Sequence, residues 1–276
     1  MLSIVKIKGG LGNQMFQYAF FLALKRRHPF SLFLFDLEES LYCHSGYQLD
    51  KVTHAHTLKS GRWYVRINKH FPKILKQFRK INQTNSLEYK EKYLKHTFIP
   101  TRYDGYWQSE KYFLYIANKV RRSFQFRENL LNEQSKKLAS YINGNEFVSI
   151  HIRRGDYTNL TDYFGLCDIE YYKKAINYIQ KHTSSPKFIF FSDDIPWVKD
   201  NLKNDDAIYV DWNQGKDCWQ DMYLMSLCKH NIIANSSFSW WGAWLNNNPQ
   251  KIVIAPEKWF KFSPNYDIIP NGWITI

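Results

Sequence analysis

The sequence has little cysteine and no long apolar run, and each absence excludes a class of protein. Its four cysteines form no CxxC pair and no Cys/His cluster with zinc-finger spacing, so we expect free thiols in a reduced, cytoplasmic protein. No stretch approaches the roughly 18 apolar residues that cross a bilayer. The longest apolar-leaning run, Phe16–Leu24, follows a glycine-rich turn instead of the charged region of a signal peptide.

Glycine and proline, at 12 and 9 of 276 residues, do not dominate the chain, and no repeat or low-complexity segment occurs. With 44% hydrophobic and 23% charged residues, the composition excludes a disordered tail, a collagen-like repeat and a coiled coil. The chain is long enough for one large domain or two modest ones with a sizeable core.

Positive charge is concentrated in the first half of the chain. The net charge is +13, and residues 1–150 hold 25 Lys and Arg against 11 Asp and Glu. Residues 51–100 alone hold 12 basic and 2 acidic side chains. Such a segment attracts phosphorylated ligands, anionic lipid headgroups or nucleic acid, and the alternative is a basic surface that serves solubility only.

The predicted elements alternate in the manner of an α/β protein. The first half opens with a strand at Leu2–Ile7, a glycine turn, a helix at Gln14–Arg27 and a strand at Ser31–Phe35. Residues 40–100 give a weaker pattern, in which Phe71–Lys80 is a candidate basic helix. The other elements expected in this half are a strand at Tyr103–Trp107 and helices near Glu110–Ser123 and Glu128–Ile142.

Asn143-Gly144-Asn145 is the expected boundary between domains 1–143 and 144–276. After it, β-rich runs alternate with helical ones, which predicts a parallel, doubly wound sheet. The strands are expected at Phe147–Ile152, Phe188–Ser192, Ala207–Val210, Ile232–Ala234 and Ile252–Ala255. The helices are expected at Ile169–His182, Pro196–Leu202, Asp217–Lys229 and Ser239–Asn246. Ligands of such sheets bind at the carboxyl ends of the strands, where the strand order reverses.

Four segments at predicted strand ends carry side chains or backbone that suit chemistry. The first is the turn from Gly9 to Gln14, where glycines let backbone N–H groups approach an anion at a helix N-terminus. It lacks the spacing of a dinucleotide fingerprint and the lysine of a Walker motif, so a tight turn without a ligand is the alternative.

The second segment, His151-Ile152-Arg153-Arg154-Gly155-Asp156-Tyr157, ends a predicted strand. Alternation along the strand places His151 and Arg153 side by side on one face. The guanidiniums of Arg153 and Arg154 would grip a diphosphate, and Asp156 would orient an arginine or act as a base. The alternative is a surface Arg–Asp salt bridge beside a packed His151.

The third segment, Ser192-Asp193-Asp194, offers carboxylates to a metal, a ribose or the N–H edge of guanine, and its alternative role is to cap the next helix. The fourth, Asn235–Gly242, offers the hydroxyls of Ser236 and Ser237 to phosphate oxygens. The alternative for this segment is capping by Ser236 or Ser239 before an aromatic core helix.

Other kinds of site find less support in the sequence. No Ser/His/Asp or Cys/His nucleophile set stands out, and the metal-binding patterns HExxH and DxD are absent. Aromatic and basic residues interleave at 61–71, which would suit single-stranded nucleic acid, but no RNP or KH signature accompanies them.

Taken in order, the motifs resemble those of glycosyltransferase family 11, the bacterial and animal α-1,2-fucosyltransferases. The resemblance is carried by Gly9–Ala19, His151–Tyr157, Phe191–Asp194 and Ile232–Leu245, and Gly105–Phe113 also has the family's pattern. It implies a GT-B architecture, with two Rossmann-like α/β domains facing each other across a cleft. Residues 1–143 would form the acceptor-side domain and residues 144–276 the domain that binds GDP-fucose.

The resemblance implies an inverting, metal-independent transfer of L-fucose from GDP-L-fucose to the 2-hydroxyl of a galactoside, in glycan synthesis of the O-antigen or capsule type. The acceptor would be a galactose-terminated oligosaccharide, free or lipid-linked, and no cofactor is implied. The alternatives are a fucosyltransferase of another linkage and a basic binder of nucleic acid or membrane surfaces without activity.

The resemblance also assigns roles to residues of these motifs. Arg153 would stabilise the charge that develops on the diphosphate, and His151 with one of the two aspartates would hold the guanine. Asp156 is the first candidate for the base that takes the acceptor proton, and the alternative is proton transfer to the leaving phosphate. The donor-binding residues implied are Gly12, Asn13, His151, Arg153, Arg154, Asp193, Asp194, Ser236 and Ser237.

The basic first half predicts a further contact. A bacterial glycan under assembly is commonly held on a lipid diphosphate at the cytoplasmic face of the membrane, where anionic headgroups attract basic segments. We therefore expect residues 59–80 to contact the membrane surface, and the alternative is a solvated basic surface. The animal members of the family carry a membrane anchor that this chain lacks, which fits a bacterial cytosolic enzyme.

Overall fold

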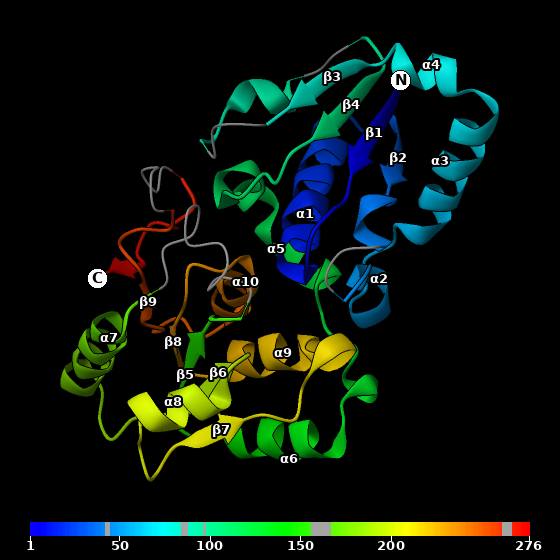
Figure 1. The fold of residues 1–276 in the computed structure, drawn as a ribbon. Helices are drawn as coiled ribbons and strands as arrows, with labels where there is room; N and C mark the ends of the chain where they lie inside the picture. The colour runs from blue at the N-terminus through cyan, green and yellow to red at the C-terminus, as the bar shows by residue number, and fades with distance from the viewer. Residues whose placement is uncertain (42–44, 84–87, 96–97, 156–166, 261–266) are drawn as a thin grey trace. The chain divides into compact units, whose positions relative to one another are not determined.

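The computed structural model describes residues 1–276 except 42–44, 84–87, 96–97, 156–166 and 261–266. The chain divides into two compact units, Met1–Arg127 with Tyr266–Ile268, and Glu128–Asn265 with Ile269–Ile276. Each unit is built on its own parallel sheet with helices packed against it (Figure 1). We describe the two units separately.

In the first unit the described strands pair in the order β2-β1-β4-β3, all parallel. The strands are β1 Leu2–Lys6, β2 Leu32–Asp36, β3 Arg79–Asn82 and β4 Thr101–Asp104. Ile4 and Leu34 pack on one face of the sheet with Tyr64 of the helix α3 (Leu58–His70). On the other face the helix α1 (Leu11–Arg27) contributes aromatic rings, so that both faces of the sheet are covered.

The remaining helical segments of this unit are short. They are α2 Leu49–Val52, α4 Pro72–Lys76 and α5 Ala117–Ser123, with 3₁₀ turns at Glu39–Leu41, Glu91–Leu94, Glu110–Tyr112 and Leu114–Ile116. The predicted helix over Phe71–Lys80 is therefore wrong, because α4 ends at Lys76 and β3 begins three residues later. Leu75 and Phe78 turn into the core there, and the N–H of Arg79 already donates to the carbonyl of Pro100 as a strand residue would.

In the second unit the described strands pair in the order β10-β9-β8-β5-β6-β7, again all parallel, so the predicted doubly wound sheet is confirmed. The strands are β5 Phe147–Ile152, β6 Lys187–Ser192, β7 Ile208–Val210, β8 His230–Ile232, β9 Val253–Ala255 and β10 Ile274–Thr275. The helices are α6 Glu133–Ile142, α7 Ile169–His182, α8 Ile195–Asn201, α9 Trp219–Leu227 and α10 Ser237–Leu245, with 3₁₀ turns at Glu128–Leu130 and Gly215–Asp217.

Alternation along β5 separates a core face from a polar face. Val148, Ile150 and Ile152 pack with the buried stripe of α7. On the opposite face the Oγ of Ser149 accepts a hydrogen bond of 2.7 Å from the Nδ2 of buried Asn231, and His151 comes next along the strand. The alternation of apolar and polar residues in the sequence predicted this division. On the polar face, side chains of β5 lie next to those of the neighbouring strand β8.

The helix α6 is part of the second unit, because Asn132 at its N-cap is tied to the loops and helices that follow β7. The N–H of Asn132 donates to Gln220 and its Nδ2 donates to Asn213, at 2.9 and 2.8 Å. The compact units consequently divide between Arg127 and Glu128, whereas the domain boundary expected from the sequence follows residue 143.

The close packing of α9 and α10 yields a test of the fold. A Cβ added at Gly242 would lie 2.9 Å from the Cβ of Met225, which is closer than real side chains pack. We expect Gly242→Ala to lower the free energy of unfolding by about 1–3 kcal/mol, as measured by urea denaturation. Ser226→Ala, on a half-exposed position of α9, should change it by less than about 0.5 kcal/mol. Unchanged stability of Gly242→Ala would contradict the described packing.

Candidate functional site

The strand order of the second unit reverses between β5 and β8. The chain lays down β6 and β7 on one side of β5, and then β8, β9 and β10 on the other side. The carboxyl ends of parallel strands at such a reversal are where doubly wound sheets bind ligands. Three of the four predicted segments follow β5, β6 and β8 directly, so the structure brings them to this end of the sheet.

Asp193 connects the end of β5 to the end of β6. Its Oδ2 lies 2.9 Å from the Nη1 of Arg153, and its Oδ1 accepts a 2.9 Å hydrogen bond from the backbone N–H of Arg154. Both charged side chains are about one quarter exposed, at 29% for Arg153 and 24% for Asp193, so a ligand can reach the pair. The carboxylate therefore holds the guanidinium of Arg153 in a fixed direction at the end of the sheet.

Arg154 is held by a different set of contacts. Its Nε donates to the Oδ2 of Asp194 at 3.2 Å, and its guanidinium lies over the ring of Trp197, 3.9 Å from the ring centroid. The Oδ1 of Asp194 accepts from the N–H of Trp197 and caps α8, which is the capping role that the sequence offered as an alternative. This stacking and pairing place Arg154 as a group that fixes the loop geometry beside Arg153.

Gly155 permits the approach of Asp193 to the arginine motif. A Cβ added at this position would lie 2.7 Å from the Oδ2 of Asp193, so the carboxylate would have to move away. The glycine of the RRGD motif therefore lets the carboxylate of Asp193 keep its place beside the arginines.

His151 lies near the end of β5, just before the two arginines in the chain, and is buried. Burial lowers the pKa of its imidazole to about 3, against the attraction of Asp193 and together with the repulsion from Arg153, so the ring is neutral at physiological pH. Its ring centroid is 5.7 Å from that of Phe238 at the start of α10. Among the described residues its Nδ1 has no hydrogen-bond partner, which leaves a buried polar atom at the strand reversal for a ligand to satisfy.

Ser236 and Ser237 lie where α10 begins, two residues before the predicted start. Ser236 is the N-cap, and its Oγ accepts a 3.3 Å hydrogen bond from the N–H of Phe238. Capping by Ser236, one of the two readings of this segment, is therefore confirmed, and Ser237 occupies the first helical position. Trp240, Trp241 and Trp244 are buried in the core, as the sequence predicted.

Gly12 and Asn13 belong to the first unit, at the carboxyl end of β1. The helix α1 begins at Leu11, three residues before the predicted start, and the N–H of Gln14 already bonds to the carbonyl of Gly10. Gly9 has a φ of +75°, which favours glycine. The Oδ1 of Asn13 accepts a 2.7 Å hydrogen bond from Gln108, a residue to which the sequence assigned no role.

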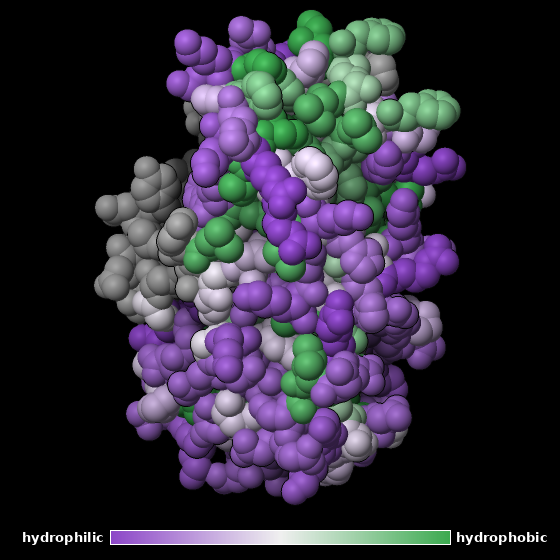
Figure 2. All heavy atoms as spheres, turned by 90° about the vertical axis from the view of Figure 1, so that its right-hand side faces the viewer, coloured by the Kyte–Doolittle hydropathy of each residue, from purple (hydrophilic) through white to green (hydrophobic). Residues whose placement is uncertain are grey.

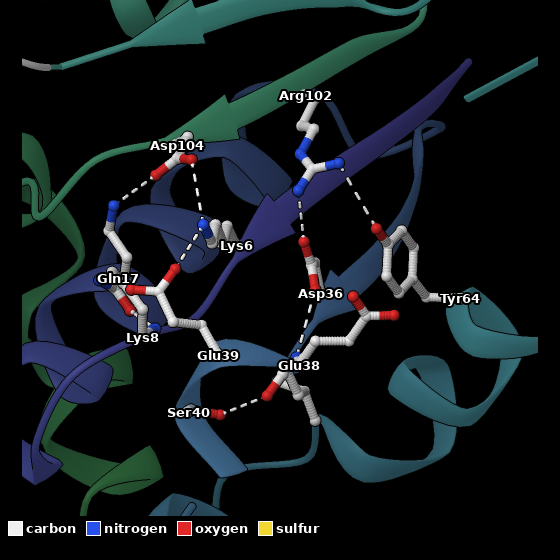
Figure 3. Close-up of polar contacts among 11 residues, drawn as sticks. Lys6, Lys8, Gln17, Asp36, Glu38, Glu39, Ser40, Tyr64, Arg102 and Asp104 are labelled. Atoms are coloured by element: carbon white, nitrogen blue, oxygen red, sulfur yellow. Dashed lines mark hydrogen bonds and ion pairs between the residues drawn. The ribbon is translucent and has the colours of Figure 1, made fainter. Parts of the chain in front are cut away.

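A second group that the sequence analysis missed lies at the carboxyl ends of β1, β2 and β4 (Figure 3). Lys6 bonds to Glu39 and Asp104, and Lys8 bonds to Asp104 at 2.7 Å. Burial alone would raise the pKa of Asp104, but Lys8 and Lys6 lower it overall, so this carboxylate stays charged. Position in the sequence gave only a partial signal, because Lys6 and Lys8 lie at the end of a predicted strand, whereas Asp104 lies near the start of the predicted strand Tyr103–Trp107.

Beside this group, Arg102 links β4 to β2 and α3. Its Nη2 lies 2.5 Å from the Oδ2 of Asp36, and its Nη1 donates to the hydroxyl of Tyr64. Burial and the negative charge of Asp36 raise the pKa of Tyr64 to about 12, so the phenol remains a neutral hydrogen-bonding group. The carboxyl edge of the first sheet therefore carries a network of paired charges.

Asp156, Tyr157 and Cys43 lie outside the residues that the structure describes. Cys167, Cys218 and Cys228 are free thiols, and burial raises the pKa of Cys167 and of Cys218 to about 11, so neither is a ready nucleophile. Across the part of the chain that the structure describes, no helix has the length and apolar character of a membrane span.

A family model described as Glycosyl transferase family 11 matches residues 2–276. Alpha-1,2-colitosyltransferase of Escherichia coli is 36% identical over 99% of this chain and 98% of that protein. The O-antigen biosynthesis glycosyltransferase WbnK of Escherichia coli is 31% identical over 98% and 99%, and galactoside 2-alpha-L-fucosyltransferase Sec1 of Mus musculus is 26% identical over 92% and 70%.

Solved fucosyltransferase structures share the fold. NodZ alpha-1,6-fucosyltransferase soaked with GDP-fucose matches with a TM-score of 0.58 at 14% identity, over 92% of this chain and 94% of that one. POFUT1 in complex with GDP matches with a TM-score of 0.52 at 11% identity, over 92% and 97%. At such identities the likeness shows the fold alone, and it confirms the predicted α/β fold of GT-B type. By the match over its whole length, the chain belongs to glycosyltransferase family 11.

Proposed function

We propose that this glycosyltransferase moves L-fucose from GDP-L-fucose to the 2-hydroxyl of a galactoside, with inversion at the anomeric carbon. One observation carries the proposal. Arg153 is anchored by Asp193 at the strand reversal of the second unit, beside the buried and neutral His151. That arrangement suits a nucleoside diphosphate, which brings negative oxygens for the guanidinium and polar ring edges for the imidazole.

The chemistry of glycosyl transfer makes Arg153 the residue with the largest task. As the bond between the anomeric carbon and the β-phosphate oxygen breaks, negative charge grows on the leaving diphosphate. A guanidinium already oriented by Asp193 stabilises that charge without reorganising during the reaction. Ser237, at the first position of α10, and the N-terminal N–H groups of that helix would hold further phosphate oxygens. We propose that these groups suffice and that no divalent metal is needed.

Asp156 remains our candidate for the base that accepts the proton of the acceptor hydroxyl. It follows Gly155 directly in the chain and lies two residues after Arg154. The alternative is a dissociative path in which the leaving phosphate takes the proton.

A second donor deserves a direct comparison because of the colitosyltransferase relative. Colitose is fucose without its 3-hydroxyl, so the same site would accept both sugars unless a polar group binds that hydroxyl. A site that hydrogen-bonds the hydroxyl rejects the deoxy sugar strongly, whereas a site that leaves it unbound discriminates little. We propose GDP-fucose as the donor and GDP-colitose as the alternative donor.

We also propose that the acceptor is a galactose-terminated glycan of the O-antigen or capsule type, and that it is carried on lipid at the cytoplasmic face of the membrane. The support for this location is the O-antigen relative and the positive charge of the first half of the chain. The enzyme would then be cytoplasmic and peripheral to the membrane.

The donor assay tests the proposed function. We expect GDP to raise the melting temperature of the protein, and GDP-fucose with a soluble β-galactoside to give a product linked α-1,2, identified by linkage analysis. GDP-fucose and GDP-colitose are compared at equal concentration. UDP is the matched control nucleotide and should shift the melting temperature less. Absence of any GDP effect together with salt-sensitive RNA binding would overturn the proposal in favour of a non-catalytic binder.

The donor assay is run with and without EDTA, which chelates divalent metals. We propose that Arg153 and Arg154 supply the positive charge that a metal would otherwise bring. Equal turnover with and without the chelator is the expected result. Activity that disappears in EDTA and returns with Mn²⁺ would contradict metal independence.

The Arg153–Asp193 pair can be tested by two substitutions. Arg153→Lys keeps the charge but loses the planar donor set, so we expect turnover to fall about 10²–10³-fold. Asp193→Asn removes the negative partner, and we expect a fall on the order of tenfold through misdirection of Arg153. Arg26→Lys at an exposed position of α1 is the matched control and should keep normal turnover. Near-normal turnover of Arg153→Lys would refute its role.

The proposed base is tested by Asp156→Asn. If Asp156 takes the proton, turnover falls while the GDP-induced shift in melting temperature stays the same. If the GDP shift falls in step with turnover, Asp156 orients an arginine instead. A fully active variant excludes both roles and favours the leaving phosphate as the proton acceptor.

A further inference from the structure

The amino-terminal edge of the first sheet carries large apolar side chains in water. The strand register pairs Leu2 with Leu32 and Arg79 with Thr101, so all four strands begin at this one edge. Leu32 is 69% exposed, and Phe30, just before β2, is 94% exposed. Phe98 and Ile99, just before β4, are 89% and 55% exposed. Several bulky side chains so exposed at one edge of a sheet are uncommon unless something covers them.

The short helix α4 extends this apolar surface. Leu75 and Phe78 anchor it to the start of the sheet by packing in the core cluster that includes Ile4 and is bordered by Leu2. With that side buried, Phe71 and Ile74 are left 56% and 54% exposed. Figure 2 shows hydrophobic side chains gathered at the end of the first unit where α4 lies, with hydrophilic ones among and around them.

The charge of the same region has one sign. The sequence from Lys51 to Leu87 contains no Asp or Glu. Exposed basic side chains lie on α4 and on the nearest ends of its neighbours, namely Lys69 of α3, Lys73 and Lys76 of α4, and Arg79 and Lys80 of β3. The C-terminal turn of α1, which ends beside Phe30, adds exposed Arg26. We call this set the amino-edge surface: Phe30, Leu32, Phe71, Ile74, Phe98 and Ile99 with Arg26, Lys69, Lys73, Lys76, Arg79 and Lys80.

The combination of exposed apolar and basic side chains distinguishes between two anionic partners, nucleic acid and a lipid bilayer. Nucleic acid uses basic side chains with flat rings for stacking, and it gains little from exposed aliphatic groups such as Leu32, Ile74 and Ile99. An anionic bilayer binds both kinds of side chain, because its headgroups attract Lys and Arg while its acyl boundary accepts aromatic and aliphatic side chains. We propose that the amino-edge surface docks the protein on an anionic lipid bilayer, with the apolar side chains inserted at the headgroup boundary.

The position of the surface within its unit is consistent with this role. The polar network of Lys6, Asp36 and Asp104 lies at the carboxyl ends of the same strands, so it is at the opposite end of the sheet from the lipid contact. Docking would therefore keep the carboxyl ends of these strands, with their paired charges, away from the lipid. The proposed lipid contact uses only the later part of the basic segment 59–80 that the sequence predicted, because Lys59 and Arg62 lie at the opposite end of α3 from α4.

This proposal deepens the membrane location given under the proposed function, and its test uses neither donor nor acceptor. The protein is sedimented with vesicles of phosphatidylcholine alone or mixed with phosphatidylglycerol, at low and near-physiological salt. We expect binding to need the anionic lipid and to weaken as salt rises, because screening acts over about 8–10 Å. Binding to neutral vesicles as strong as to anionic ones would overturn the electrostatic part of the proposal.

Two pairs of substitutions separate charge from insertion. Lys73→Glu with Lys76→Glu should weaken vesicle binding at least about fivefold per lysine. Phe30→Ser with Ile74→Ser keeps the net charge and should weaken it about tenfold per side chain. If the serine pair binds like the unmodified protein, the apolar side chains do not insert and the proposal fails.

The matched controls lie in the second unit. Lys174→Glu with Lys181→Glu, at exposed positions of α7, changes the net charge by the same amount and should leave most of the binding intact. Leu130→Ser removes an apolar side chain that is 50% exposed. Each variant must keep the unmodified melting temperature, so loss of folding is distinguished from loss of docking. If both charge-reversed pairs weaken binding equally, net charge and not the amino-edge surface is responsible. Binding to RNA that survives in the serine pair and exceeds vesicle binding would favour a nucleic-acid partner.

Discussion

The carboxylate of Asp193 organises the candidate donor site, because it joins two strand ends that the sequence separates by about forty residues. It receives the guanidinium of Arg153 on one oxygen and the backbone N–H of Arg154 on the other. It also approaches Gly155 so closely that any side chain there would have to displace it. The pair is partly exposed, so solvent screens its attraction and its contribution to stability is modest. Its value lies in orientation, since a guanidinium fixed before the donor arrives loses less freedom on binding.

This pairing also explains how a nearly neutral unit would bind an anionic donor. Residues 151–276 hold 13 basic and 14 acidic side chains, so bulk attraction is absent. Arg153 pairs with Asp193, and Arg154 pairs with Asp194. Because carboxylates already orient both guanidiniums, a diphosphate would have to match their fixed geometry, and this geometry matters more than net charge. The strong positive charge of the first half is not needed for that step, which is why it calls for a separate explanation.

Much of the second unit could be predicted from the sequence, because local patterns determine it. The bounds of β5 and α7 were predicted as they are found, since each has an uninterrupted period of two or 3.6 residues. The predicted strand Ile232–Ala234 is displaced by two residues, because β8 begins at His230, in register with Val148 of β5. The helix expected at Phe71–Lys80 failed for a tertiary reason, since β3 pairs with β4, which lies about twenty residues further along the chain.

Side-chain partners were harder to predict than elements. The alternation of β5 predicted which face carries His151 and Arg153, but the resemblance assigned an aspartate to guanine, and the sequence did not reveal that Asp193 holds Arg153. The pairing of Lys6 and Lys8 with Asp104, and of Arg102 with Asp36, depends on strands that are neighbours only in the folded sheet. Such contacts have no local period to show them. The same sheet explains both ends of the first unit. Parallel strands place all their carboxyl ends together, where paired charges collect. They place all their amino ends together as well, and there apolar and basic side chains of the described residues are exposed.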